Sequence, residues 1–132
     1  MFQDRTDAGI QLAEALKGYT GQDVVVFALP RGGVVLGAEI ARTLQAPLDL
    51  VITKKIGHPH NPEYAICAMA EESDPICNQP EVDRVDPLWF QEEVERIRRE
   101  IRRRRRKYLG DAPQRDVQGK IAIIVEIGRA HV

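Results

Sequence analysis

The chain has 132 residues and a mass of 14.9 kDa, which suits one domain of ordinary size and is too short for two separate cores. Hydrophobic residues make up 43% and charged residues 30%, so the composition differs from that of a disordered protein. A formal charge of -1 excludes a globally basic nucleic-acid-binding protein. We expect a cytoplasmic protein, because the sequence shows no signal peptide and no apolar run of the roughly 18 to 20 residues that span a bilayer.

The first half of the sequence predicts a helix followed by a strand-helix-strand unit. Apolar residues at helical spacing predict a helix over residues 4–19. The apolar run at 24–29 is typical of a strand that is covered on both faces. A helix over 34–44 and a strand over 48–53 follow, and this order indicates a parallel sheet.

The second half predicts a loop, an extended segment, a long helix and a last strand. Glycine and proline favour a loop over 56–62, and 64–70 alternates like a strand or an extended flap. Asp86 as N-cap and Pro87 at the first position open the long helix, which Gly110 ends. Its apolar stripe consists of Phe90, Val94, Ile97, Ile101 and Tyr108. The run 121–125 predicts a third buried strand.

Cysteine and histidine residues give no reason to expect a disulfide or a metal site. Cys67 and Cys77 do not form a CxxC pair, and we interpret them as buried small side chains. His58 and His60 flank a proline, and no third ligand lies at a suggestive spacing. We therefore predict exposed loop histidines and assign no metal-binding residue.

A basic run in the long helix, residues 102–107, is the one feature that could bind nucleic-acid phosphates. Glutamates precede the arginines along the helix, which complements the helix dipole, and Glu92–Arg96 and Glu95–Arg99 have the spacing of ion pairs. No aromatic residues interleave with the run to stack on bases. A solvated helix face is the favoured interpretation, and nucleic acid is not an expected partner.

The turn after the first strand is the most informative segment for function. Gly32 and Gly33 would let the backbone approach an anion with inward-pointing N–H groups, at the start of the following helix. Arg31 adds a cation suited to phosphate oxygens. The alternative is a tight strand-to-helix turn with an exposed arginine. The spacing of the glycines fits neither a P-loop nor a GxGxxG fingerprint.

Lys54 and Lys55 follow the second predicted strand. This position lies at the same carboxyl edge of the sheet as the glycine turn, where open α/β folds bind ligands. One of the two side chains must point away from such a site, because successive strand residues face opposite sides. The alternation does not say which one, and a solubilising strand end is the alternative for both.

Three stretches together resemble the type I phosphoribosyltransferase family, in its bacterial branch of predicted phosphoribosyltransferases. They read VVVFALPRGGVVLGAEIA, LDLVITKKIGHPHNPEYAICAMAE and KIAIIV, and the resemblance extends over residues 2–125. It implies an α/β fold with a partial Rossmann-like parallel sheet, flanking helices and a flap region. Residues 1–125 would be the N-terminal part of a phosphoribosyltransferase domain.

The resemblance also implies roles for individual residues. The glycine turn would be the pyrophosphate-binding loop, the cation of the next strand would be Lys54 or Lys55, and 57–63 would belong to a flap that closes over the site. Arg31 and the lysine would stabilise charge on the leaving pyrophosphate. The residues expected at the substrate are Pro30, Arg31, Gly32, Gly33, Lys54, Lys55, Asn61 and Glu63.

The implied activity is transfer of a phosphoribosyl group from phosphoribosyl pyrophosphate to a nitrogenous base, with Mg²⁺ bridging the pyrophosphate oxygens. Two alternatives stay open: a regulator of the same fold that binds a nucleotide, RNA or DNA without catalysis, and a hydrolase of phosphate esters. The sequence does not indicate the acceptor base or a general base. It leaves the oligomeric state undetermined, with a homodimer as one option.

The last seven residues, EIGRAHV, depart from the family pattern. The family carries two acidic residues and a loop rich in glycine and threonine after this strand, whereas here Glu126 alone could mimic the first acid and Ile127 cannot replace the second. The codons GAG ATC GGA AGA GCA CAC GTC encode these residues and resemble read-through into a common sequencing adapter. We therefore expect residues 126–132 to be a non-native tail. We also expect this chain to be truncated and inactive by itself.

Overall fold

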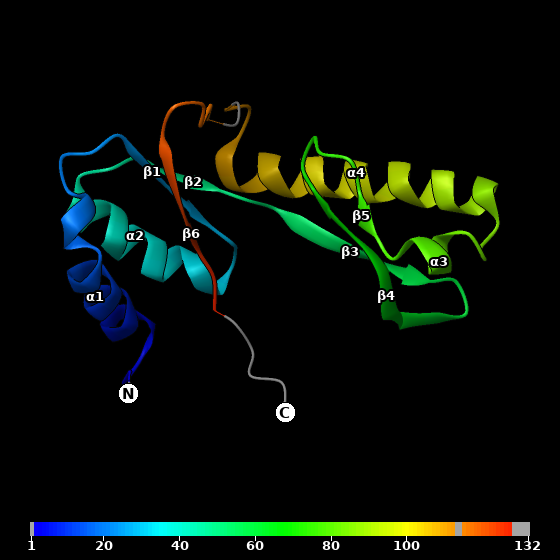
Figure 1. Cartoon of the computed structure of the whole chain (residues 1–132), viewed down its shortest axis with the longest axis horizontal. Helices are drawn as coiled ribbons and strands as arrows, with labels where there is room; N and C mark the ends of the chain where they lie inside the picture. Colours follow the sequence, from blue (N-terminus) through cyan, green and yellow to red (C-terminus); the bar gives the residue numbers. More distant parts are fainter. Residues whose placement is uncertain (1, 113–114, 128–132) are drawn as a thin grey trace. The chain divides into compact units, whose positions relative to one another are not determined.

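The computed structural model describes residues 2–112 and 115–127, which form two compact units. Unit 1 comprises residues 1–51 and 113–132, and unit 2 comprises residues 52–112. Each unit has a sheet of three strands (Figure 1). The two units are described in turn.

The sheet of unit 1 is parallel, as the sequence predicts. Its strands are β1 (Val24–Ala28), β2 (Leu48–Leu50) and β6 (Ile121–Val125), in the order β2-β1-β6. All five residues of β1 are buried, which agrees with a central strand that has no polar position.

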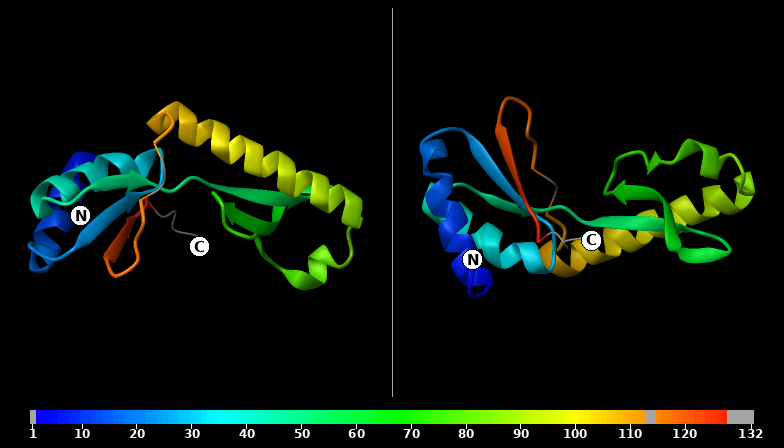
Figure 2. Two further views of the ribbon diagram at one scale, coloured as in Figure 1. Left: turned by 90° about the horizontal axis from the view of Figure 1, so that it is seen from above. Right: turned by 60° about the horizontal axis from the view of Figure 1, so that its bottom comes forward.

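Helices cover one face of this sheet: α1 (Arg5–Ala15), the short 3₁₀ helix η1 (Lys17–Tyr19) and α2 (Gly32–Leu44) (Figure 2). The Asp4 carboxylate caps α1 by accepting a hydrogen bond from the Asp7 backbone N–H at 2.8 Å. The core between helices and strands contains Ala8, Ala13, Val24, Val26, Leu36, Ile40, Ala41, Leu44 and Val125.

Two expectations for unit 1 were wrong. The helix predicted over 4–19 is interrupted, and Tyr19 of its predicted apolar stripe is exposed because the chain tightens into η1 after Ala15. The strand predicted as fully buried, β6, alternates in burial, and Ile124 is 67% exposed. In the described chain β6 pairs only with β1, so it forms an edge of the sheet.

A buried carboxylate ties the segment before β6 to β2. Asp49 is 4% exposed, and its side chain accepts hydrogen bonds from the backbone N–H groups of Leu50 at 2.8 Å and Arg115 at 2.9 Å. Backbone donors therefore compensate for the burial of this polar group.

The sheet of unit 2 is antiparallel, and it replaces a predicted loop. Its strands are β3 (Thr53–His58), β4 (Asn61–Ala70) and β5 (Ile76–Cys77), in the order β3-β4-β5. The expected loop over 56–62 is instead the end of a hairpin with a turn at residues 59–60. Irregular register around Gly57 accommodates the glycine and the prolines, because a side chain at Gly57 would collide with the Pro62 carbonyl.

The two cysteines form a disulfide, which corrects the expectation of unpaired thiols. Cys67 of β4 lies directly opposite Cys77 of β5, with their Cα atoms 4.1 Å apart. The sequence spacing of ten residues gives no sign of this pairing, because only the return of the chain as β5 brings the two positions together.

Two helices follow β5: the short α3 (Gln79–Val82) and the long α4 (Pro87–Leu109), with boundaries as predicted for α4. Asp86 caps α4 through the Leu88 N–H, and Gly110 ends it. Ile97 and Ile101 are buried, whereas Tyr108 at the end of the predicted stripe is 39% exposed. In the described ranges, no helix combines the length and the apolar character needed to cross a membrane.

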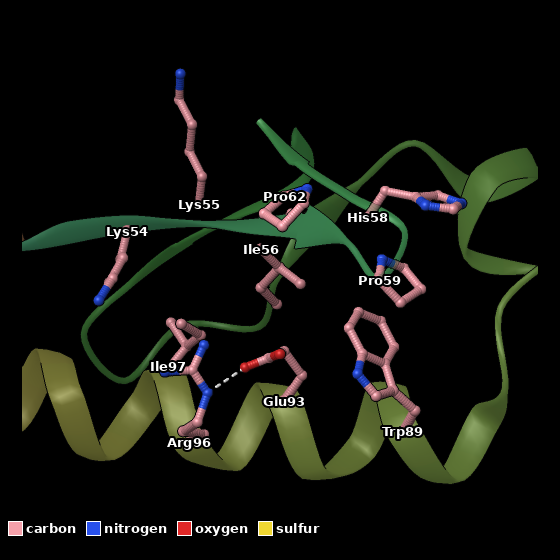
Figure 3. Close-up of a pocket in the computed structure, with 11 residues that line it drawn as sticks. Lys54, Lys55, Ile56, His58, Pro59, Pro62, Trp89, Glu93, Arg96 and Ile97 are labelled. Atoms are coloured by element: carbon pink, nitrogen blue, oxygen red, sulfur yellow. Dashed lines mark hydrogen bonds and ion pairs between the residues drawn. The ribbon is translucent and has the colours of Figure 1, made fainter. Parts of the chain in front are cut away.

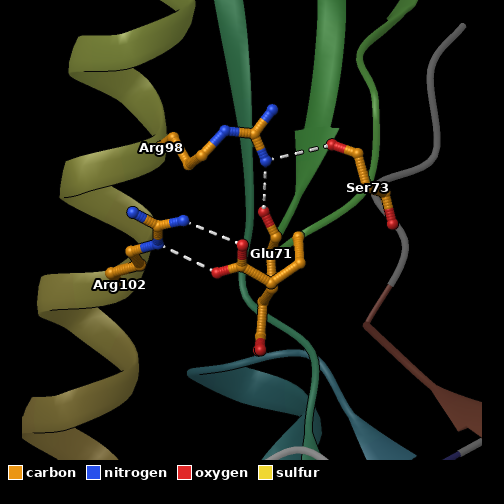
Figure 4. Close-up of polar contacts among 5 residues, drawn as sticks. Glu71, Ser73, Arg98 and Arg102 are labelled. Atoms are coloured by element: carbon orange, nitrogen blue, oxygen red, sulfur yellow. Dashed lines mark hydrogen bonds and ion pairs between the residues drawn. The ribbon is translucent and has the colours of Figure 1, made fainter.

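Arginines of α4 hold the segment after β4 (Figure 4). Glu71 and Arg105 form an ion pair at 2.9 Å, and their side chains are only 7% and 11% exposed. Arg98 donates to the backbone carbonyls of Glu71 and Ser73. The Glu71 carboxylate also accepts a longer hydrogen bond from the Ile52 N–H at 3.4 Å, so one buried side chain connects three segments of unit 2.

The exposed charges of unit 2 pair differently from the predicted i,i+4 pattern. Arg96 pairs with Glu93 and Arg103 pairs with Glu100, each three residues away, in place of the predicted Glu92–Arg96 and Glu95–Arg99 pairs. The hydrogen bond from Arg103 lowers the pKa of the Glu100 carboxyl. Arg102 donates two hydrogen bonds to Glu72 and lowers the pKa of that carboxyl in the same way.

We expect Glu71→Gln to destabilise the chain by about 3 kcal/mol, because it removes the carboxylate of a buried ion pair. Glu72→Gln is the matched control, since it makes the same chemical change one residue away in an exposed ion pair, and it should change stability little. Urea unfolding followed by circular dichroism measures both. Equal effects of the two substitutions would contradict this role of Glu71.

Candidate functional site

The glycine turn joins β1 to α2, and the structure begins the helix earlier than the sequence predicts. α2 starts at Gly32, so both glycines lie in its first turn, and Arg31 is the exposed residue immediately before it. The Pro30–Arg31 peptide bond is cis. Because it directly precedes α2, Arg31 lies at the positive end of the helix dipole, where an anion is favoured.

The packing of α2 against the end of β6 requires a glycine at position 33. A Cβ atom there would lie 2.7 Å from the Val125 backbone carbonyl oxygen, so only glycine lets α2 approach the end of β6 this closely. The Gly33 N–H donates to the Leu29 carbonyl at 3.0 Å. In this conformation, then, the Gly33 N–H is used inside the turn and does not point toward a ligand as the sequence analysis expects.

Gly32 faces different neighbours, and one of them is a cation that the sequence analysis missed. A Cβ atom on Gly32 would collide with the side chain of Ile127 and would lie 3.4 Å from Cζ of Arg5. Arg5 is the first residue of α1, so the packing of α1 beside α2 brings a second guanidinium to the start of α2. A single arginine distant in sequence carries no motif that could have indicated this.

The two lysines lie inside β3, which corrects the expectation that they follow the second strand of the parallel sheet. β2 ends at Leu50, and a new strand of the antiparallel sheet begins at Thr53. Figure 3 shows Lys54 directed toward α4 and Lys55 directed away from it. Lys55 is the more exposed of the two side chains.

The remaining candidates in unit 2 lie near the hairpin turn. Asn61 and Glu63 are exposed at the start of β4, and Asn61 is opposite His58 in the register. The His58 ring accepts a hydrogen bond from the His60 N–H at 3.1 Å. No cluster of three or more His, Cys, Asp or Glu side chains suited to a metal ion occurs within residues 2–112 and 115–127.

The structure thus divides the predicted site residues between the two units. Pro30, Arg31, Gly32 and Gly33 share unit 1 with Arg5. Lys54, Lys55, Asn61 and Glu63 belong to unit 2. Of the predicted non-native tail, residues 128–132 lie outside the described residues, and its assignment stays a prediction.

Most of the basic run on α4 is engaged within unit 2. The carboxylates that pair with it are Glu72 for Arg102, Glu100 for Arg103, Glu71 for Arg105 and Asp111 for Arg106. Four of the five arginines at 102–106 therefore have protein partners, which supports the interpretation as a charge-compensated helix face.

Comparison with known proteins identifies the family of the chain. The model of the family described as "Phosphoribosyl transferase domain" matches residues 3–126, nearly the whole chain. The chain belongs to the phosphoribosyl transferase family. The family resemblance seen in the sequence is thereby confirmed, and so is the expected α/β class of fold.

Relatives of known sequence and structure give the same assignment to this phosphoribosyl transferase chain. Two curated proteins of Mycobacterium tuberculosis, named "Putative phosphoribosyl transferase MT0597" and "Putative phosphoribosyl transferase Rv0571c", are each 37% identical over 98% of the chain. The crystal structure of TT1426 from Thermus thermophilus matches 95% of the chain with a TM-score of 0.76 and 36% identity. The chain spans 30% of the length of each curated relative and 60% of the solved chain.

We expect Gly33→Ala to lower the free energy of unfolding by about 1–3 kcal/mol, because the new methyl group meets a backbone carbonyl that cannot move freely. Gly32→Ala is the comparison variant, since its methyl group would collide with the Ile127 side chain, which can rotate away, in place of a backbone carbonyl. Thermal unfolding measures both. A larger loss for Gly32→Ala would contradict the packing role of Gly33.

Proposed function

We propose that this chain is part of an enzyme that transfers the phosphoribosyl group of phosphoribosyl pyrophosphate to a nitrogenous base and releases pyrophosphate. The observation that carries the proposal is the turn from β1 to α2, where Arg31 precedes the helix N-terminus in a chain of this family. The full activity is proposed for a protein of the length of the curated relatives, of which the chain spans 30%.

The turn from β1 to α2 would stabilise the negative charge on the leaving pyrophosphate. The Arg31 guanidinium offers two parallel N–H donors to phosphate oxygens, and the helix N-terminus adds a fixed positive potential. Arg5, whose guanidinium lies beside Gly32, would contribute a second cation. Catalysis would come mainly from positioning and from electrostatic stabilisation of the departing group.

Lys55 is our choice for the lysine that contacts the substrate. Its side chain is exposed and points away from α4, whereas Lys54 points toward α4 and helps lower the pKa of the Glu100 carboxyl there. Asn61 and Glu63, exposed at the start of β4, would belong to the flap that closes over the reacting sugar. Closure would exclude water from a reactive cationic sugar.

Mg²⁺ would accompany the substrate and would not need a dedicated protein site. Within the described ranges no cluster of potential ligands could hold a metal ion by itself. Magnesium commonly keeps several waters and binds through substrate phosphates and one or two carboxylates. Coordination mainly by the pyrophosphate oxygens fits these residues, and the metal would supply neutralisation of the leaving group.

The two other functions considered have less support. A nucleic-acid-binding regulator would need a free basic surface, but the arginines at 102, 103, 105 and 106 form ion pairs with carboxylates of unit 2. A phosphate-ester hydrolase would form product from phosphoribosyl pyrophosphate without an acceptor. Measuring product with and without added bases therefore separates hydrolysis from transfer.

We expect Arg31→Ala to weaken binding of phosphoribosyl pyrophosphate at least tenfold, because it removes charge-assisted hydrogen bonds worth about 1.5–3 kcal/mol each. Arg5→Ala should weaken it less. The matched control is Arg42→Ala, since Arg42 is exposed near the other end of α2 and pairs with Glu39. Isothermal titration calorimetry with Mg²⁺ present measures binding to the chain.

Release of pyrophosphate is measured with the full-length protein. The proposal is wrong if neither the chain binds phosphoribosyl pyrophosphate nor the full-length protein turns it over. Normal binding by Arg31→Ala would instead show that the substrate lies elsewhere.

A further inference from the structure

A pocket within unit 2 is lined from α4 by Trp89, Glu93 and Arg96, which have no role in the function proposed above. Lys55 and part of the proposed flap line it from the hairpin. The pocket is a cavity of about 320 Å³ between the β3–β4 hairpin and α4 (Figure 3). Ile56 and Ile97, which are 0% and 1% exposed, contribute apolar surface to its lining. Both side chains belong to the core of unit 2, so the pocket has a rigid base.

An aromatic side chain lines one side of this pocket. The Trp89 indole rises from α4 toward Pro59 of the hairpin turn, as Figure 3 shows. Trp89 and Pro59 also line a neighbouring cavity of about 320 Å³, so the indole is accessible from both. An accessible indole face beside an apolar floor suits a planar ring, because stacking on an aromatic side chain is worth about 1–3 kcal/mol per base.

Cations line the other side. Lys54 points toward α4, and within the described residues it has no carboxylate at ion-pair distance. Arg96 lies on the facing helix and pairs with Glu93. Lys54, Arg96 and Glu93 together carry one net positive charge at the end of the pocket away from Trp89. This charge suits a ligand whose ring stacks on Trp89 and carries an anionic group.

The size of the cavity limits the ligand. Small-molecule pockets range over roughly 300–1,000 Å³, so this one is at the lower end. A single base with one sugar and one phosphate is therefore a better match than a dinucleotide. Trp89 and Arg96 are about 10 Å apart along the axis of α4, so the ligand must carry its ring and its charged group at opposite ends, as a nucleotide does.

We propose that the pocket between the β3–β4 hairpin and α4 binds a nucleoside monophosphate, with the base against Trp89 and the phosphate at Lys54 and Arg96. The inference rests on the side chains of unit 2 and does not depend on phosphoribosyl transfer. No residue of the glycine turn lines the pocket.

Trp89 is the only tryptophan of the chain, so its fluorescence reports directly on this pocket. The chain is titrated with AMP, GMP and UMP, with adenosine and inorganic phosphate as the partial ligands. We expect saturable quenching by at least one nucleotide, at least tenfold weaker binding of adenosine, and no change with phosphate alone. Absence of saturable quenching by all three nucleotides would overturn the proposal.

Variants then locate the binding by calorimetry. Lys54→Gln should weaken nucleotide binding about fivefold to tenfold, and Trp89→Leu should abolish it while Trp89→Phe keeps part of it. Arg106→Gln is the matched control, because it removes one positive charge from an exposed position of α4 outside the pocket. Equal effects of Lys54→Gln and Arg106→Gln, or loss of binding only in Arg31→Ala, would place the nucleotide elsewhere and overturn the assignment.

Discussion

The close approach of α2 to the parallel sheet is the constraint on which unit 1 depends. Gly33 touches the Val125 carbonyl, and Gly37 lies against Ala28 and Leu48, with no room for a side chain at either position. The helix therefore starts directly above the carboxyl ends of β1 and β6. This geometry presents Arg31 and the helix N-terminus at the edge where parallel sheets bind anions.

The two glycines of the turn differ in their surroundings. Gly33 satisfies a packing requirement, and its N–H is used by the Leu29 carbonyl. Gly32 has only flexible side chains near it, including that of Arg5. A pair of glycines that forms one motif in the sequence thus divides into one residue that packs against a backbone carbonyl and one that is buried against the side chains of Ile127 and Arg5.

Unit 2 depends on charge compensation as well as on apolar burial. The long helix α4 carries too many arginines to be held by Ile97 and Ile101 alone, and the segment after β4 supplies the Glu71 carboxylate and backbone carbonyls to it. The disulfide between Cys67 and Cys77 closes that segment. The charged composition of α4 suggests an exposed helix. In the structure, α4 instead forms one side of a packed and partly buried polar network.

The sequence by itself determined the elements that follow from local pattern: the buried strand at 24–28, the helix from Pro87 to Leu109 with its two caps, and the family, which a few short motifs identify. Tertiary structure alone decided the relations between distant segments. It turned a predicted loop into a hairpin, joined Cys67 to Cys77, brought Arg5 to the start of α2 and set Lys54 as the lysine that faces α4. Periodicity and capping act over a few residues, whereas strand register and helix packing depend on which segments meet, and that information is not local.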